Sequence, residues 1–147
     1  MRTTLTALAT LSFSFTLMAA DPFVGTWKLN VAKSTLKGAN ADLAGATMTI
    51  SPLGPNAFRT TEDELLKSGE KRHVEINRTY DGKEHPATGV GFKQEGASEI
   101  DQRLNESTRK ITQKRDGKVR GEFTSTVSPD GKVMTNAGES TLVFERQ

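Results

Sequence analysis

The sequence predicts an all-β protein, an antiparallel up-and-down meander that closes into a β-barrel of about eight to nine strands. Apolar and polar residues alternate with a period of two through much of the chain, for example over 74–80 and 119–127, which is typical of a sheet with one buried face. Asp-Gly, a strong signal for a tight hairpin turn, occurs three times between such segments. Few segments favour a helix that could cover the apolar face, so the sheet is expected to close into a barrel or to split into a sandwich.

Turn signals separate the expected strands. The Asp-Gly turns are Asp81-Gly82, Asp116-Gly117 and Asp130-Gly131, and two further turns are marked by Ser68-Gly69 and by residues 53–56. The segments with clear alternation are 47–51, 73–80, 100–105, 119–127 and 141–145. Segments 32–46 and 62–67 are weakly periodic, and each is expected to be a loop or a single turn. Residues 85–96 contain one proline and three glycines and are expected to form a longer connection or flap.

Residues 1–20 have the pattern of a secretory signal peptide. Arg2 is their only charged residue, an apolar stretch follows it, and the small residues Ala19 and Ala20 precede Asp21. The alternative is a membrane anchor, but the stretch is shorter and more polar than a membrane span requires. We therefore expect cleavage after Ala20, a mature domain over 21–147 without a membrane span, and a secreted or periplasmic location.

Composition and charge exclude several classes of function. The full sequence has 20 Lys and Arg against 18 Asp and Glu, and without Arg2 the mature chain has 19 against 18. With charges this balanced and no run of basic residues, we expect no nucleic-acid partner. The chain has no cysteine, which excludes disulfides, thiolate metal sites and thiol nucleophiles.

The two ends of the mature chain resemble the calycins, the group that contains lipocalins and fatty-acid-binding proteins. Gly25-Thr26-Trp27 matches the Gly-x-Trp of their first strand, and 142–147 resembles the last strand of fatty-acid-binding proteins. Segments 80–86 and 128–132 are similar to exported bacterial lipocalin-like proteins. The resemblance implies a lipocalin-like barrel in which Gly25 and Trp27 are structural, with Trp27 buried at one end. An arginine of a late strand could stack on its ring. The alternative is that Trp27 contacts a ligand.

The chain departs from this family pattern in several places. Fatty-acid-binding proteins have a helix pair as a lid after the first strand, and 31–46 does not have the pattern of two helices. Their last strand carries an Arg-x-Tyr pair that holds a carboxylate, and the matching positions here are Leu142 and Phe144. Avidins also open with Gly-Thr-Trp, but Trp27 is the only tryptophan, so biotin is not expected.

The alternation predicts which side chains face the barrel lumen. The apolar inward set is Trp27, Leu29, Met48, Ile50, Phe58, Val74, Ile76, Ile100, Leu104, Ile111, Val119, Phe123, Val127, Leu142 and Phe144. The polar residues of the same parity are Arg78, Tyr80, Gln102 and Gln113. A mostly apolar lining with a few polar groups is the composition of a small-molecule pocket. We hypothesise an amphipathic ligand with its apolar body against Phe58, Phe123 and Phe144 and its anionic end at Arg78 and Tyr80, in place of the absent Arg-x-Tyr pair.

Arg78 is the only inward cation that the pattern identifies. An unpaired buried charge is costly, so Arg78 needs an anionic or water-filled setting, or the alternation is interrupted by a bulge or by the barrel rim. The alternative to an anion site is that Arg78 extends to the rim and pairs with a loop acid such as Asp81 or Glu84.

The sequence does not indicate catalysis. It contains no Gly-x-Ser-x-Gly elbow and no His-Glu-x-x-His motif. The carboxylate pairs Glu62/Glu64 and Glu99/Asp101 lie on polar strand faces and are expected to be solvated. His85 stands in a short acidic turn that is also expected to be solvated. We therefore expect no metal, no cofactor and no enzymatic activity.

These observations predict a secreted or periplasmic lipocalin-like protein that binds a small apolar or amphipathic molecule in its lumen. The alternative is a barrel filled by its own side chains, acting through its loops as an interaction or stress-related module. A barrel of about eight strands is wide enough for either. Whether the lumen holds a cavity distinguishes the two.

Overall fold

In the computed structural model, residues 20–147 form one antiparallel sheet of eleven strands. The strands are β1 (Gly25–Leu29), β2 (Leu43–Gly54), β3 (Ala57–Leu66), β4 (Lys71–Thr79), β5 (Glu84–Pro86), β6 (Thr88–Val90), β7 (Ala97–Asn105), β8 (Thr108–Arg115), β9 (Lys118–Val127), β10 (Val133–Ala137) and β11 (Thr141–Arg146). Their order across the sheet is β5-β7-β8-β9-β10-β11-β1-β2-β3-β4-β6. The predicted signal peptide lies outside the described residues except for its last residue, so it stays a prediction.

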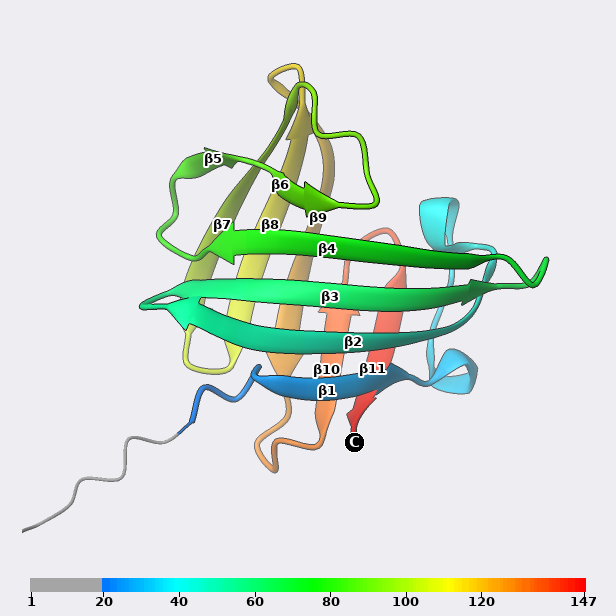
Figure 1. The fold of residues 1–147 in the computed structure, drawn as a ribbon. Helices are drawn as coiled ribbons and strands as arrows, with labels where there is room; N and C mark the ends of the chain where they lie inside the picture. The colour runs from blue at the N-terminus through cyan, green and yellow to red at the C-terminus, as the bar shows by residue number, and fades with distance from the viewer. Residues whose placement is uncertain (1–19) are drawn as a thin grey trace, which may run out of the picture.

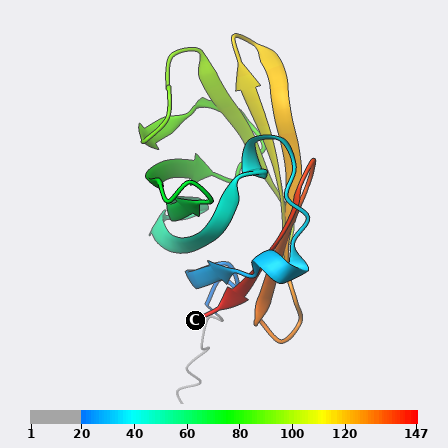
Figure 2. The same cartoon turned by 90° about the vertical axis from the view of Figure 1, so that its right-hand side faces the viewer.

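The sheet curls into a nearly closed barrel. Strands β1 to β4 run across one side, and β7 to β11 cross behind them at a steep angle (Figure 1). The side view shows the two layers facing each other (Figure 2). Strand β1 joins the layers because it pairs with both β2 and β11. The predicted all-β antiparallel barrel is confirmed.

The barrel has a seam between β4 and β7, which share no backbone ladder in the described sheet. Strand β5 pairs with β7 and β6 pairs with β4, so the short segment between them bridges the seam. Both short strands lie within 84–90, largely inside the segment predicted to be a flap. They raise the strand count to eleven, above the predicted eight or nine.

Two of the three Asp-Gly turns are hairpins. Asp116 and Gly117 have φ values of 49° and 73°, as a type I′ turn requires, and they join the paired strands β8 and β9. Asp130-Gly131 joins β9 to its neighbour β10. Asp81-Gly82 follows β4 but leads into β5, which pairs with β7. The predicted hairpin at Asp81-Gly82 is therefore wrong, because this turn carries the chain across the seam.

The segment between β1 and β2 contains two single turns of 3-10 helix, η1 (Val31–Lys33) and η2 (Gly38–Asn40). This agrees with the predicted absence of a helical lid pair. The expectation of a loop or turn at 62–67 is wrong for most of that segment, because β3 continues to Leu66 and pairs on both sides. No helix in the part of the chain from residue 20 onward is long and apolar enough to cross a membrane.

Trp27 is completely buried, as expected from the Gly-x-Trp pattern. Its Nε1 donates a hydrogen bond to the Phe23 carbonyl at 2.9 Å, and the guanidinium of Arg146 from the last strand stacks 4.1 Å from the ring centroid. Gly25 has a φ of 139°, and a Cβ at this position would lie 2.5 Å from Arg146 Nη1. The motif thus has a physical reason, because only glycine lets Arg146 lie over the tryptophan.

The predicted inward face is correct on β1 to β4 and wrong on β7 and the start of β9. Leu104 is 50% exposed and Val119 is 60% exposed, and Ile100 is only partly buried. On β7 the side chains of the opposite parity turn inward. On β9 a bulge leaves Arg120 unpaired, since Gln113 pairs with Gly121 while Lys114 pairs with Val119. A bulge reverses the alternation beyond it.

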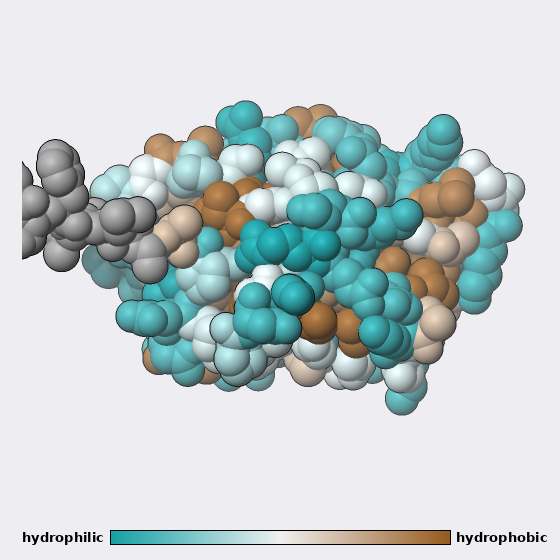
Figure 3. Space-filling model, turned by 90° about the horizontal axis from the view of Figure 1, so that it is seen from below, coloured by the Kyte–Doolittle hydropathy of each residue, from teal (hydrophilic) through white to brown (hydrophobic). Residues whose placement is uncertain are grey.

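The outside of the barrel is mainly polar. Seen from below, apolar residues form separate areas within a largely hydrophilic face (Figure 3). Scattered exposed apolar side chains are normal for protein surfaces.

Candidate functional site

The barrel lumen holds a cavity of about 380 Å³, a volume near the lower end of the range of small-molecule sites. Its apolar walls come from both layers of the barrel and comprise Met48, Ile50, Val74, Ile76, Ile111, Phe123, Met134 and Leu142. The cavity reaches the surface where exposed residues of η2, β9 and the β10–β11 turn line it, among them Ala39, Arg120 and Glu139. The lumen is therefore not filled by side chains.

The six predicted ligand-binding residues occupy three different settings. Arg78, Tyr80 and Phe123 line the cavity. Phe58 and Phe144 are buried in the core and do not line it. Gln102 is exposed. The structure brings the first three together as predicted and removes Gln102 from the site.

The prediction for Gln102 is wrong because Glu99 and Asp101, which have the opposite parity on β7, face inward. Glu99 lies opposite Gln113, and Asp101 lies opposite Ile111. Both carboxylates are buried, with 6% and 3% of their surface exposed. The prediction that Glu99 and Asp101 are solvated is therefore wrong. An arginine of another strand compensates Glu99 in the interior, and an alternation of hydrophobicity within one strand cannot reveal such a partner.

Arg78 is held by Glu99 across the barrel seam. Its Nε donates to Glu99 Oε2 at 3.1 Å and its Nη2 donates to Oε1 at 3.4 Å, while Gln113 Nε2 donates to the same Oε1 at 3.2 Å. Burial opposes the charge of Arg78, but the attraction of Glu99 and of other nearby oxygens outweighs it and raises the pKa of the guanidinium. Arg78 thus closes the seam with side chains where backbone hydrogen bonds are missing.

This geometry differs from both sequence-based interpretations of Arg78. Its two best-placed donor groups are already engaged by Glu99, so a ligand carboxylate would have to compete with it. The proposed loop partners lie elsewhere, since Asp81 pairs with His85 at 2.9 Å and Glu84 pairs with Lys114. The buried partner, Glu99, was missed because the predicted inward face of β7 was the wrong one.

Arg109 is a second inward cation that the sequence analysis missed. It is 1% exposed, and its guanidinium lies 3.8, 4.4 and 4.2 Å from the ring centroids of Phe23, Phe58 and Tyr80. Its Nη2 donates to Asp21 Oδ1 at 2.9 Å. Burial lowers the pKa of Arg109, although Tyr80 and Asp21 oppose this. Its position two residues before inward Ile111 was the available signal.

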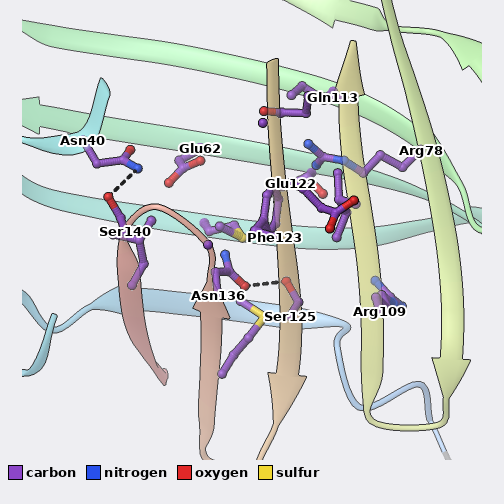
Figure 4. Close-up of a pocket in the computed structure, with 18 of the residues that line it drawn as sticks. Asn40, Glu62, Arg78, Arg109, Gln113, Glu122, Phe123, Ser125, Asn136 and Ser140 are labelled. Atoms are coloured by element: carbon purple, nitrogen blue, oxygen red, sulfur yellow. Dashed lines mark hydrogen bonds between the residues drawn. The ribbon is translucent and has the colours of Figure 1, made fainter. Parts of the chain in front are cut away.

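Glu62 is a further misplaced residue, because it was expected on a solvated strand face and instead lines the cavity. It lies on β3 between Met48 and Val74 of the neighbouring strands, and all three line the cavity (Figure 4). No hydrogen bond or ion pair to Glu62 occurs within residues 20–147. Burial, followed by repulsion from Glu64, raises the pKa of Glu62 to about 7. This carboxyl is thus available to a ligand.

Asp101 is a second carboxyl with altered acidity. Burial raises its pKa to about 7, although Arg78 opposes the shift, and its Oδ1 is buried without a hydrogen-bond partner. Asp101 does not line the main cavity, but a smaller cavity of about 230 Å³ at the seam. No group of three side chains in the described part of the chain is placed to hold a metal ion.

No protein-family model matches this chain. No curated protein matches it either. Among solved structures, it is similar to the wild-type fluorescent protein UnaG, with a TM-score of 0.57 and 19% identity over 85% of this chain and 97% of that one. A point mutant of UnaG gives a TM-score of 0.59 and 18% identity over 86% of this chain and 96% of that one. At this identity the similarity shows the barrel fold alone.

Proposed function

We propose that this protein binds a small apolar or amphipathic molecule in the lumen of its barrel and acts after export, in a secreted or periplasmic location. The observation that carries the proposal is the cavity of about 380 Å³ with mainly aliphatic and aromatic walls. The same cavity speaks against a barrel filled by its own side chains. Export rests on the pattern of residues 1–20.

An anionic end of the ligand at Arg78 and Tyr80 has less support than the apolar body. Glu99 neutralises Arg78 through two hydrogen bonds, and burial raises the pKa of Tyr80. Tyr80 is therefore a neutral phenol that can exchange a hydrogen bond with a ligand. A carboxylate at this position would have to displace a buried ion pair or add a charge beside it.

We propose a binding role and no enzymatic one. Ser125 and Ser140 line the cavity, but their hydroxyls donate to Asn136 and to the Lys37 carbonyl, respectively. Within residues 20–147, neither hydroxyl is hydrogen-bonded to a histidine or a carboxylate that could activate it as a nucleophile. Glu62, a cavity carboxyl without a partner within residues 20–147, lies between two apolar side chains.

Filling the cavity tests the proposal. Native mass spectrometry of the protein purified from its own compartment should show an adduct, and calorimetric titration should show binding of n-decanol. Ile76→Trp, which fills the lumen from β4, should abolish both. Thr126→Trp places the same ring on the exposed side of β9 and should leave binding unchanged. Absence of binding by the wild type, or equal binding by Ile76→Trp, would contradict a lumenal site.

A further inference from the structure

We propose that Glu62 is the polar anchor of the cavity and that the ligand carries a basic nitrogen, as an amine or a similar organic cation with an apolar body. This inference rests on the proposed function, because it names the class of molecule that the lumen takes. It differs from the anionic ligand that the sequence suggested. Its basis is the position of one carboxyl group, the side chains around it, and its lack of a hydrogen-bond or ion-pair partner within residues 20–147.

The position of Glu62 directs its carboxyl into the cavity. The inward row across the sheet is Met48, Glu62 and Val74, and the next row is Ile50, Thr60 and Ile76. Directly opposed side chains in such rows are in contact distance, so the carboxyl is flanked by apolar groups on both sides. Figure 4 shows Glu62 on the wall formed by β2 and β3, with Phe123 on the crossing strand β9. A ligand between the two walls would meet both residues.

The charged groups beside Glu62 are already paired. Glu64 on the same strand binds Arg72 of β4 at 2.8 Å, and Arg78 of β4 binds Glu99 at 3.1 Å. On the other side, β2 contributes Met48 and no charge. Glu62 is therefore the one interior carboxyl bordering the main cavity that lacks a partner within residues 20–147.

Arg109 of β8 also borders the cavity, and its Nη2 donates to Asp21 Oδ1 at 2.9 Å. The other charges that border the cavity lie at its mouth. Arg120, Glu122 and Glu139 are exposed there, and Glu122 pairs with Lys110 at 3.1 Å. Water and salt screen exposed charges, so these groups act weakly on a ligand head inside the lumen. The interior wall thus offers one uncompensated acceptor group, which selects for a donor that carries positive charge.

The acidity of Glu62 agrees with this choice. An ammonium group would satisfy the carboxylate with charge-assisted hydrogen bonds, which are about twice as strong as neutral ones. It would also supply a counter-charge that opposes the effect of burial, which raises the pKa of Glu62 to about 7. A carboxylate head group would add a second negative charge to the same wall. A hydroxyl head could donate one hydrogen bond but no charge.

Three probes with one chain and different heads test the inference: n-decylammonium, n-decanol and n-decanoate, titrated by calorimetry at pH 8 below their micelle concentrations. We expect wild-type protein to bind decylammonium at least about 10-fold more tightly than decanol, and decanoate most weakly. Glu62→Gln keeps the shape of the side chain and removes its charge, so it should abolish the preference for decylammonium over decanol.

The matched control is Glu106→Gln, which removes an exposed carboxylate from the turn between β7 and β8 and should keep the preference. Circular dichroism confirms that each variant is folded. Equal or tighter binding of decanoate, or a preference for decylammonium that survives Glu62→Gln, overturns the role of Glu62 while the lumenal site stands. Failure of all three probes to bind the wild type overturns the proposed function together with this inference.

Discussion

Removing one partner of the Arg78–Glu99 pair should destabilise the barrel more than removing both. The pair joins β4 to β7 where the sheet has no ladder, and the two side chains are only 9% and 7% exposed. Arg78→Met leaves Glu99 as a buried carboxylate with Gln113 as its remaining donor. We expect this to cost about 3–5 kcal/mol of unfolding free energy.

The double variant Arg78→Met/Glu99→Leu leaves no unpaired charge from the pair and fills similar volume with apolar atoms. Such replacements are often neutral, so we expect it to lie within about 1 kcal/mol of the wild type. The two substitutions should therefore be strongly non-additive, as expected for groups in direct contact.

Urea unfolding at pH 7, followed by the fluorescence of the single buried Trp27, measures these differences. Arg59→Met is the control, because Arg59 pairs with Glu75 on the outer face at 3.3 Å, and an exposed pair contributes at most about 1 kcal/mol. If Arg78→Met costs no more than Arg59→Met, or if the double variant shows the sum of the single effects, the pair does not hold the seam.

Three further predictions concern Trp27, the cavity and the N-terminus. Trp27→Ala should cost about 3–5 kcal/mol in urea unfolding followed by circular dichroism, and an unchanged midpoint would contradict its structural role. Decylammonium affinity should rise roughly 10-fold between pH 6 and pH 8, because Glu62 with a pKa of about 7 ionises in this range; a flat profile in calorimetry would contradict the anchor. Intact mass of the exported protein should show a chain that begins at Asp21, and a retained 1–20 segment would contradict secretion.

The fold was predictable because local signals agree with the global topology. The alternation on β4 is uninterrupted, and Asp116-Gly117 has the positive φ values that its composition favours. Where the chain departs from local rules, prediction failed. No local sequence signal marks the bulge at Arg120, because the bulge is defined only by how β9 pairs with β8. The pairing of β5 with β7 likewise depends on closure of the whole barrel.

The candidate site was predictable only where its residues are apolar or aromatic. Tyr80 and Phe123 follow the alternation of their strands and line the cavity. Glu99 and Arg109 do not follow the rule that charged residues lie outside, because each finds its counter-ion on a distant segment, namely Arg78 and Asp21. The burial of these charges depends on their counter-ions, and the sequence of one strand does not reveal a counter-ion that lies on another segment.

Glu62 differs from these paired residues, and the difference bears on function. Two steps of the alternation from inward Phe58 lead to Glu62 through Thr60, so its direction was available from the sequence, but its lack of a partner was not. A carboxyl with a pKa raised from 4.5 to about 7 binds more protons in the folded state than in the unfolded one across that interval. Its ionisation therefore destabilises the fold as the pH rises from about 4.5 to 7. Ionised Glu62 therefore lowers the stability of the free protein, and a bound cation would remove this cost. Ligand binding accounts for a carboxyl at this position, whereas folding does not.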